Sequence, residues 1–371
     1  MSATPTRLHT LYRDCGQTPW LDNLTRDTLR NGTFQRRLEQ GIRGVTTNPT
    51  TFDRAITGSD AYDDELAHVV QRARVEDAYW HAVASDARAA LELLRPLHDA
   101  TGGRDGFVSV ELNPALAYDT DRTVRDARRL QTRLQAPNLM VKVPATEAGL
   151  PAIRQLVAEG CNVNVTLIFG LDRYRQVHDA YLEGLTALHQ QGRDLTAVSG
   201  VASFFLSRVD TDVDHRLAAI GTDRALRLRG TAAIAQAKLA YDEFRRTLHT
   251  DRWRRLADAG GQPQRPLWAS TSVKNPDYPP LRYVEELIGP GTVTTMPDET
   301  LDAFVARGTV ACTLDRGVDD ARDTLRALAE VGIDLAEVAA RLEAEGVAAF
   351  ARSYDHALDA VAAKATAVHQ R

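Results

Sequence analysis

The chain has 371 residues, of which 43% are hydrophobic and 26% are charged, a balance typical of a soluble globular protein. Its formal net charge of −5 argues against nucleic acid as a partner. The polar N-terminus predicts no signal peptide, and no apolar run reaches the roughly 18 residues that a membrane span needs, so no membrane association is expected.

Eight short runs of strand-forming residues alternate with helical segments along the chain. The runs occupy residues 20–24, 44–48, 107–112, 139–143, 163–169, 198–205, 266–272 and 292–296. Such alternation predicts parallel strands joined by right-handed crossovers. For a chain of this length we expect a closed α/β barrel, the (β/α)8 TIM barrel, with a doubly wound open sheet as the main alternative.

Three regions are longer than a single crossover helix requires. Residues 50–105, between the second and third strands, are predicted to hold two helices, and residues 206–265, between the sixth and seventh, two more. Residues 297–371 are predicted to form four helical segments packed on the barrel. We therefore expect one domain over residues 1–371, as a monomer or a homodimer.

The three cysteines lie far apart in the sequence and fit no metal-binding motif. Cys15, Cys161 and Cys312 therefore suggest a reducing compartment, and the chain is predicted to be cytoplasmic.

Lysine is scarce, because only four of the 45 basic residues are lysine. Arginine stays protonated, whereas a desolvated lysine amine can act as a nucleophile. Lys238 and Lys364 lie in alanine-rich helical patterns that are typical of ordinary helix faces. Lys142 and Lys274 instead follow strand-like runs, which makes them candidates for chemistry.

Polar side chains share one face of several predicted strands. Asn164 and Thr166 oppose apolar neighbours on the fifth strand, and Lys142 does so on the fourth. The same holds for Ser109 and Glu111 on the third strand, Asp22 on the first and Asn48 on the second. For any one of these residues, a satisfied core group or a helix cap is the commoner explanation. Their shared parity favours an active site at the carboxyl ends of the strands.

A lysine that faces two carboxylates in a pocket suits imine catalysis. Its amine attacks a ketone, and the resulting iminium accepts the electrons of the adjacent carbon–carbon bond. One carboxylate would remove a hydroxyl proton, and the other would move protons through water as the carbinolamine dehydrates.

The chain resembles the transaldolase family, specifically its long bacterial branch. The resemblance spans nearly the whole barrel in the segments WLDNL, GVTTNPTTF, VSVELNP, PNLMVKVPAT, GCNVNVTLIF, VASFFLSRVD, LWASTSVKNPDY and TVTTMPDETL. It implies that Lys142 is the Schiff-base lysine and that Asp22 is the general base for C3–C4 cleavage. It also implies that Glu111 relays protons and that Thr166 holds the catalytic water.

The same resemblance implies a substrate site. Asn48 and Asn164 match the amides that bind the dihydroxyacetone moiety, and Ser203 matches a further sugar contact. The phosphate site falls on Arg208, Ser272 and Lys274, although the short branch carries arginine where we align Lys274. The implied reaction transfers dihydroxyacetone from sedoheptulose 7-phosphate or fructose 6-phosphate to an aldose phosphate, without a cofactor, in the pentose phosphate pathway.

Three rival functions are weighed against this one. Fructose-6-phosphate aldolase resembles transaldolase but carries tyrosine where this chain has Phe205 and glutamine where it has Glu111. A metal-dependent hydrolase would need ligands at strand ends, yet all ten histidines fall in predicted helices or loops. The acidic stretch 210–214 imitates a calcium loop but is interpreted as a solvated helix start. A non-catalytic scaffold is the third alternative.

Overall fold

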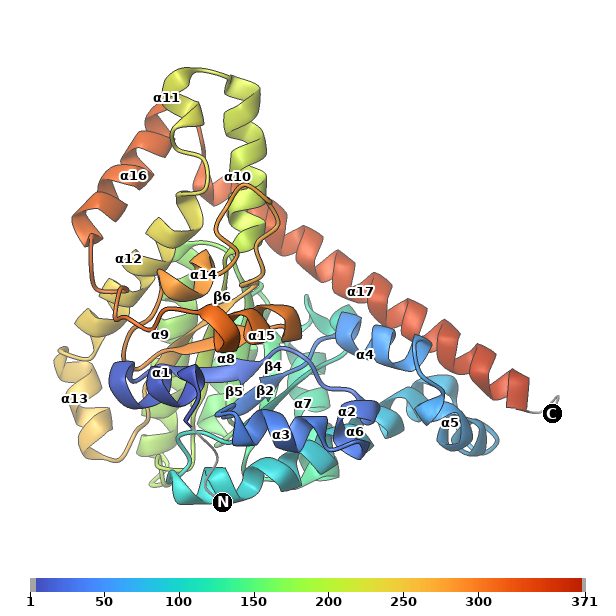
Figure 1. Ribbon diagram of the computed structural model, residues 1–371. Helices are drawn as coiled ribbons and strands as arrows, with labels where there is room; N and C mark the ends of the chain where they lie inside the picture. The colour runs from blue at the N-terminus through green and yellow to red at the C-terminus, as the bar shows by residue number, and fades with distance from the viewer. Residues whose placement is uncertain (1–4, 369–371) are drawn as a thin grey trace.

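The computed structural model describes residues 5–368, which form a closed barrel of eight parallel strands in sequence order (Figure 1). The strands are β1 (Thr18–Leu21), β2 (Gly44–Thr46), β3 (Phe107–Glu111), β4 (Leu139–Pro144), β5 (Val163–Ile168), β6 (Gly200–Phe205), β7 (Gln264–Ala269) and β8 (Val293–Met296). The predicted (β/α)8 barrel is therefore confirmed, and the alternative of an open sheet is excluded.

The register of the central strands decides which side chains meet. Lys142 on β4 lies opposite Glu111 on β3 and Asn164 on β5. Neighbouring residues of a parallel register point to the same face of the sheet. The valines between them, Val141 and Val143, are fully buried. The polar set therefore converges at one end of the barrel.

In the described chain, single α-helices form four of the seven strand connections, and the other three connections and the C-terminal region carry more than one. Before β3 lie α1 (Arg7–Cys15), α2 (Arg26–Arg30), α3 (Thr33–Glu39), α4 (Pro49–Thr57), α5 (Asp63–Val70) and α6 (Val75–Ala100). The next crossovers are α7 (Thr120–Leu134), α8 (Gly149–Ala158) and α9 (Leu171–Gln190). Between β6 and β8 lie α10 (Ser207–Ile220), α11 (Asp223–Leu226), α12 (Ala232–Thr247), α13 (Asp251–Asp258) and α14 (Arg282–Glu285). After β8 come α15 (Asp298–Arg307), α16 (Val318–Glu330) and α17 (Leu335–Val368).

The predicted numbers of extra helices were wrong in all three regions. In the described chain the β2–β3 connection holds the α-helices α4, α5 and α6, and the β6–β7 connection holds α10 to α13. The C-terminal region holds three helices rather than four, because α17 runs unbroken for 34 residues. Gly346 lies inside this helix, and a Cβ there would come within 2.9 Å of the Leu167 side chain on β5. Close packing on the barrel therefore favours a small residue at this position of the helix.

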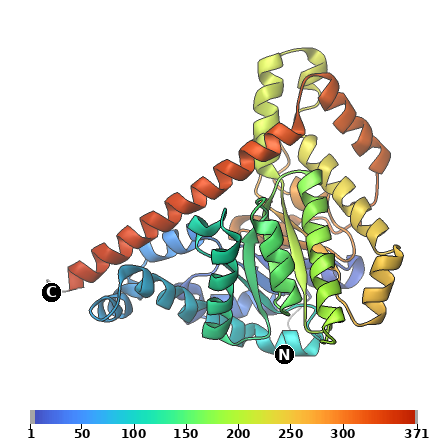
Figure 2. The same ribbon diagram turned by 180° about the vertical axis from the view of Figure 1, so that it is seen from behind.

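Helix α17 crosses the barrel obliquely and continues along α4 and α5 (Figures 1 and 2). It is held to α4 by a hydrogen bond of 2.8 Å between Ser353 and Thr50, and by the His356–Asp53 pair at 2.6 Å. Tyr354 donates to Glu76 on α6 at 2.9 Å. These contacts place the C-terminal helix beside the site described below.

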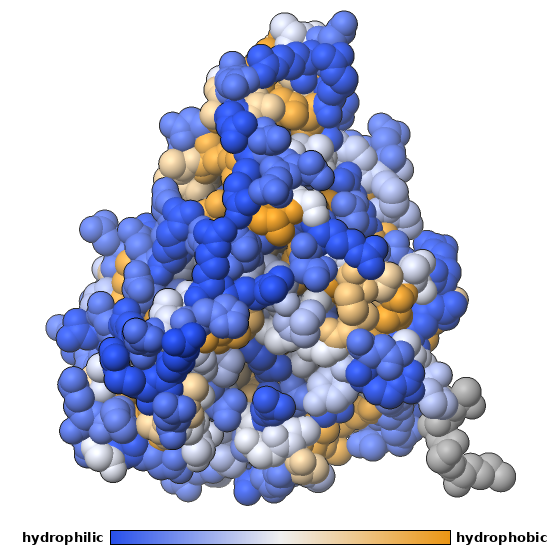
Figure 3. Space-filling view, turned by 90° about the vertical axis from the view of Figure 1, so that its left-hand side faces the viewer, coloured by the Kyte–Doolittle hydropathy of each residue, from blue (hydrophilic) through white to orange (hydrophobic). Residues whose placement is uncertain are grey.

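The surface is largely polar. The face drawn in Figure 3 is mostly hydrophilic, and its apolar residues lie in small separate groups. Over the described residues, the exposed large apolar side chains are Leu93, Tyr118, Ile220 and Leu226. No helix in that part of the chain is both long and apolar enough to cross a membrane.

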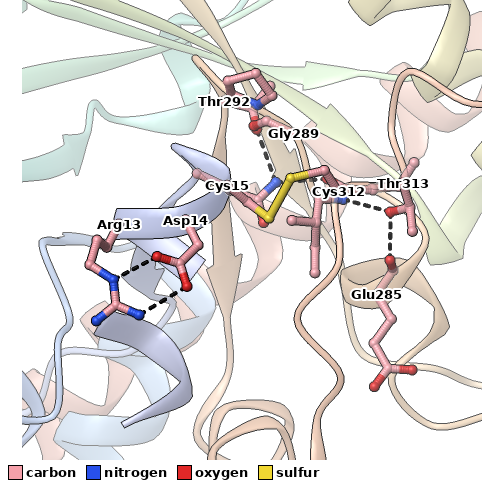
Figure 4. The surroundings of a disulfide bond; sticks show 12 residues. Arg13, Asp14, Cys15, Glu285, Gly289, Thr292, Cys312 and Thr313 are labelled. Atoms are coloured by element: carbon pink, nitrogen blue, oxygen red, sulfur yellow. Dashed lines mark hydrogen bonds and ion pairs between the residues drawn. A yellow bond between two sulfur atoms is a disulfide. The ribbon is translucent and has the colours of Figure 1, made fainter. Parts of the chain in front are cut away.

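A disulfide joins Cys15, at the end of α1, to Cys312, in the loop between α15 and α16 (Figure 4). The two residues are 297 positions apart in sequence, with Cα atoms 5.7 Å apart. The separation of the cysteines in sequence, from which a reducing compartment was inferred, therefore does not keep two of them apart, because distance along the chain does not limit proximity in a closed barrel. Cys161 is free and buried.

Reduction of this disulfide is expected to destabilise the fold without affecting turnover. The bond lies beside Thr292, just before β8, and so at the amino ends of the strands, away from the end where the polar set converges. Reductant should lower the free energy of unfolding by about 2–4 kcal/mol, measured by denaturant titration. A Cys15→Ser/Cys312→Ser variant should not respond to reductant, whereas Cys161→Ser should respond as the wild type does. An unchanged unfolding midpoint in the reduced wild type would contradict this role.

Candidate active site

The polar residues predicted from strand parity meet in one cavity at the carboxyl ends of the strands. Eight of the ten predicted site residues line this cavity: Asp22, Asn48, Lys142, Thr166, Ser203, Arg208, Ser272 and Lys274. The other two, Glu111 and Asn164, contact lining residues. The eight lining residues come from six strands or strand ends and from α10. A pocket at this end of a barrel is where the fold places its active sites.

Lys142 is held in the floor of the cavity, with its side chain only 6% exposed. Its Nζ donates to the carbonyl oxygen of Thr47 at 2.9 Å and lies 3.0 Å from Glu111 Oε2. The ring of Phe350 from α17 lies over this nitrogen, with 5.8 Å between Nζ and the ring centroid. The amine is therefore sheltered from solvent and has a carboxylate within direct reach.

Glu111 is a buried carboxyl group in a mixed electrostatic environment. Burial raises its pKa, and the nearby Asp22 raises it further, while Lys142 and Arg208 oppose the shift. The net direction is upward, because desolvation is the largest of these effects. A carboxyl group with a raised pKa exchanges protons more readily near neutral pH than an exposed glutamate does.

Asp22 follows β1 and is oriented by a short chain of hydroxyls. Its Oδ1 accepts a hydrogen bond from Thr46 on β2 at 2.9 Å, and Thr46 is 2.9 Å from the hydroxyl of Thr295 on β8. One carboxylate oxygen is therefore fixed by the barrel, and the residue still lines the cavity. This leaves Asp22 able to accept a proton from a bound hydroxyl.

A second polar chain runs through β3, β5 and β6. Asn164 donates to Ser109 at 2.9 Å, and Ser203 donates to Asn164 at 2.7 Å. The hydroxyl of Thr166 is buried and has no partner among the described residues. The pairing of β5 with β6 shifts register just after Val165, and Leu167 has a left-handed φ of 61°. This bulge sits next to Thr166, where such irregularities commonly redirect a side chain toward a site.

Besides Lys142, three cationic side chains line the cavity. Arg208 from α10, Lys274 from the loop after β7 and Arg54 from α4 all line it. Within residues 5–368, none of the three forms an ion pair. Lys274 only donates to Ser272, at 2.7 Å. Burial lowers the pKa of Arg208 while Asp22 and Glu111 raise it, but an arginine remains charged. These unpaired cations suit an anionic group such as phosphate.

Among the cavity residues that the sequence interpretation missed, two have side chains that can act on a bound substrate. Arg54 lies on α4, the helix that Asn48 caps by accepting a hydrogen bond from the Thr51 amide. Its position one to two turns after Asn48 could therefore have indicated a place near the site. Phe350 lies more than 200 residues from Lys142 in the sequence, within an alanine-rich helix. No local pattern distinguishes it from an ordinary core residue.

The acidic stretch 210–214 is not the solvated helix start that was expected. Asp210 accepts from the Ala233 amide at 2.8 Å and from Tyr283 at 2.7 Å, and burial raises its pKa to about 6. Asp214 accepts from the Gly230 amide and from Tyr278. These two aspartates are buried on the inner face of α10. Through Tyr278, Asp214 anchors the loop that carries Lys274.

Comparison with known proteins agrees with this geometry. Residues 19–361 match the family described as transaldolase/fructose-6-phosphate aldolase. The chain belongs to this family. It is 49% identical to a transaldolase of Thermobifida fusca over 352 residues, which cover 94% of this chain and 96% of that protein. It is 48% identical to one of a Parafrankia species over 349 residues, 93% and 95% of the two chains.

A transaldolase 1 of Streptomyces avermitilis is 46% identical over 352 residues, which cover 94% of this chain and 93% of that protein. Membership of the transaldolase/fructose-6-phosphate aldolase family at this identity makes the chain a Schiff-base transferase of carbohydrate metabolism.

Proposed function

We propose that Lys142 forms the Schiff base through which this chain transfers a dihydroxyacetone unit. The donors are sedoheptulose 7-phosphate and fructose 6-phosphate, and the acceptors are glyceraldehyde 3-phosphate and erythrose 4-phosphate. The observation that carries the proposal is a buried amine 3.0 Å from a carboxylate, in a cavity that is also lined by cations without an ion-pair partner among the described residues.

Imine formation requires proton transfer in both directions. Lys142 Nζ attacks the ketone carbon, the carbonyl oxygen takes up a proton, and that oxygen leaves as water when the carbinolamine dehydrates. Glu111 lies beside the nitrogen, and the unpaired hydroxyl of Thr166 can hold a water between them. We assign the proton relay to this pair.

Cleavage then breaks the bond between C3 and C4 of the bound ketose. Asp22 removes the proton of the C4 hydroxyl, the aldose phosphate leaves, and the bonding electrons pass to the iminium to give an enamine. The enamine carbon attacks the acceptor aldehyde, whose oxygen recovers the proton from Asp22. The second carboxylate oxygen of Asp22 is free for this role, because Thr46 holds the first.

The remaining residues recognise the sugar. Asn48, Asn164 and Ser203 are positioned to bind hydroxyls of the dihydroxyacetone moiety, and Arg208, Ser272 and Lys274 to bind the phosphate. Arg54 adds a planar guanidinium to the cavity that Lys274 lines. It can supply the bidentate contact that a lysine cannot make.

Borohydride reduction in the presence of fructose 6-phosphate tests the proposal directly. The reduced imine should appear as a dihydroxyacetone adduct on the peptide that contains Lys142, identified by mass spectrometry. Peptides that contain Lys238, Lys274 or Lys364 serve as internal controls and should stay unmodified. An adduct on any of these three, or none at all, would reject Lys142 as the nucleophile.

The rate of imine formation should fall on the acid side of neutrality. Glu111 must be ionised to accept a proton. Because its pKa is raised, the loss of rate on acidification should begin at a higher pH than for an ordinary glutamate, whose pKa is about 4.3. Glu111→Gln should slow imine formation about 100-fold and abolish the fall of its rate at acidic pH. Stopped-flow rates across pH measure both effects. If the rate of imine formation depends on pH in the same way in the variant and the wild type, Glu111 is not part of the proton relay.

We also propose that residues 1–371 are one domain, since α17 contacts β5, α4, α5 and α6. A cytoplasmic location and a monomeric or homodimeric state remain proposals. They rest on the metabolic role of the family, and the location draws no support from the cysteines now that two of them are paired.

A further inference from the structure

Phe350 is an aromatic residue in the cavity that the mechanism above does not use. It is 4% exposed and lines the pocket beside Lys142, although it comes from the C-terminal helix. Its ring lies over Lys142 Nζ, 5.8 Å from nitrogen to centroid. The polar partners of the same nitrogen are Glu111 and Thr47. The amine therefore has both polar and aromatic neighbours.

The ring is held in place from both directions along α17. One turn before it, Gly346 packs against Leu167, where a Cβ would come within 2.9 Å of the leucine side chain. One turn after it, Tyr354 donates to Glu76 at 2.9 Å, accepts from Trp80 at 3.2 Å and lies edge-on to Tyr79. Residues four apart lie on the same helix face, so these contacts fix the side chain between them.

We propose that Phe350 is a specificity-determining residue that favours transfer over release of free dihydroxyacetone. This inference rests on the proposed function of Lys142. In the enamine, the nucleophilic carbon is bonded to the carbon that carries Nζ, so it lies within reach of a ring placed over that nitrogen. The ring offers no proton to that carbon, and it presents an apolar surface to the adduct.

The two fates of the enamine differ in what they need at that carbon. Release begins when the enamine carbon takes a proton, which regenerates the iminium. Water then adds to the iminium carbon, the C–N bond breaks, and Lys142 is freed as an amine with loss of dihydroxyacetone. Transfer instead forms a carbon–carbon bond to an aldehyde, whose oxygen takes a proton from Asp22. An apolar ring that has no proton to donate therefore slows release of dihydroxyacetone and not its transfer.

The test compares release and transfer in variants of Phe350. Phe350→Ala opens space for water and should raise release of dihydroxyacetone from fructose 6-phosphate alone by about tenfold relative to transfer. Phe350→Gln keeps the length but brings a hydrated group and should act in the same direction. Phe350→Leu retains an apolar wall and should keep the wild-type ratio. Release is followed with a dehydrogenase that consumes dihydroxyacetone.

Leu342→Ala is the matched control, because it truncates a buried residue of α17 that does not line the cavity. It should leave the ratio unchanged. An unaltered ratio in both Phe350→Ala and Phe350→Gln would overturn the inference, as would an equal rise in Leu342→Ala. Borohydride labelling of Lys142 in the same variants separates this outcome from failure of the proposed function. If labelling persists while the ratio stays constant, only the role of Phe350 is wrong.

Discussion

Lys142→Arg should abolish turnover, lowering kcat by at least about 10⁴-fold, because a guanidinium cannot form the imine. The substitution keeps a cation next to Glu111, which is 3.0 Å from the lysine nitrogen, so the fold should survive. Coupled assay of aldose phosphate formation gives the rate, and thermal unfolding followed by circular dichroism checks the fold.

Lys238→Arg is the control for this experiment. Lys238 lies on α12 and donates to the carbonyls of Thr313 and Arg316, and it does not line the cavity. Its replacement should leave kcat within about twofold of the wild type, because few substitutions remote from a site alter catalysis. Measurable turnover by a folded Lys142→Arg protein would refute a covalent role for the lysine.

Asp22→Ala should slow carbon–carbon cleavage by about 10² to 10⁴-fold while leaving imine formation largely intact. The reason is that Asp22 acts on the substrate hydroxyl, whereas Glu111 is the carboxylate beside the amine. Imine formation can be timed by borohydride quenching, and cleavage by release of the aldose phosphate in a single turnover.

Asp22→Asn tests the proton-accepting role of Asp22 separately from its hydrogen bond with Thr46. An asparagine keeps an oxygen that can accept from Thr46, which now donates to Asp22 at 2.9 Å, but it cannot take a proton. It should therefore lose as much cleavage activity as the alanine variant. Recovery of cleavage in Asp22→Asn, or equal losses in both chemical steps, would show that Asp22 positions other groups rather than acting as the base.

Strand parity explains why so much of the site could be predicted. Side chains alternate between the two faces of a strand, so the positions of Lys142 and Glu111 among valines already placed them on one face. The register then sets them opposite each other. The helices were harder to predict, because short ones such as α11, four residues long, have too few residues to show a helical period.

The two candidate residues that sequence patterns missed differ in their origin. Phe350 reaches the cavity through contacts between distant segments. Arg54 reaches it because α4 begins at the mouth of the barrel, which follows from the position of Asn48 after β2. The aspartates of α10 looked solvated because charge in a local pattern usually faces water. In the fold, Tyr283 and Tyr278 bury them.

Local alternation of polar and apolar residues was thus enough to predict eight strands, their parallel closure and the inward face that carries the lysine. Three features follow instead from packing: the Cys15–Cys312 bond, the unbroken course of α17 and the ring of Phe350 above the amine. The physical reason is that periodicity records which side of an element avoids water. Periodicity does not indicate which distant element covers that side, because this depends on how the shapes of all the elements fit together in the barrel.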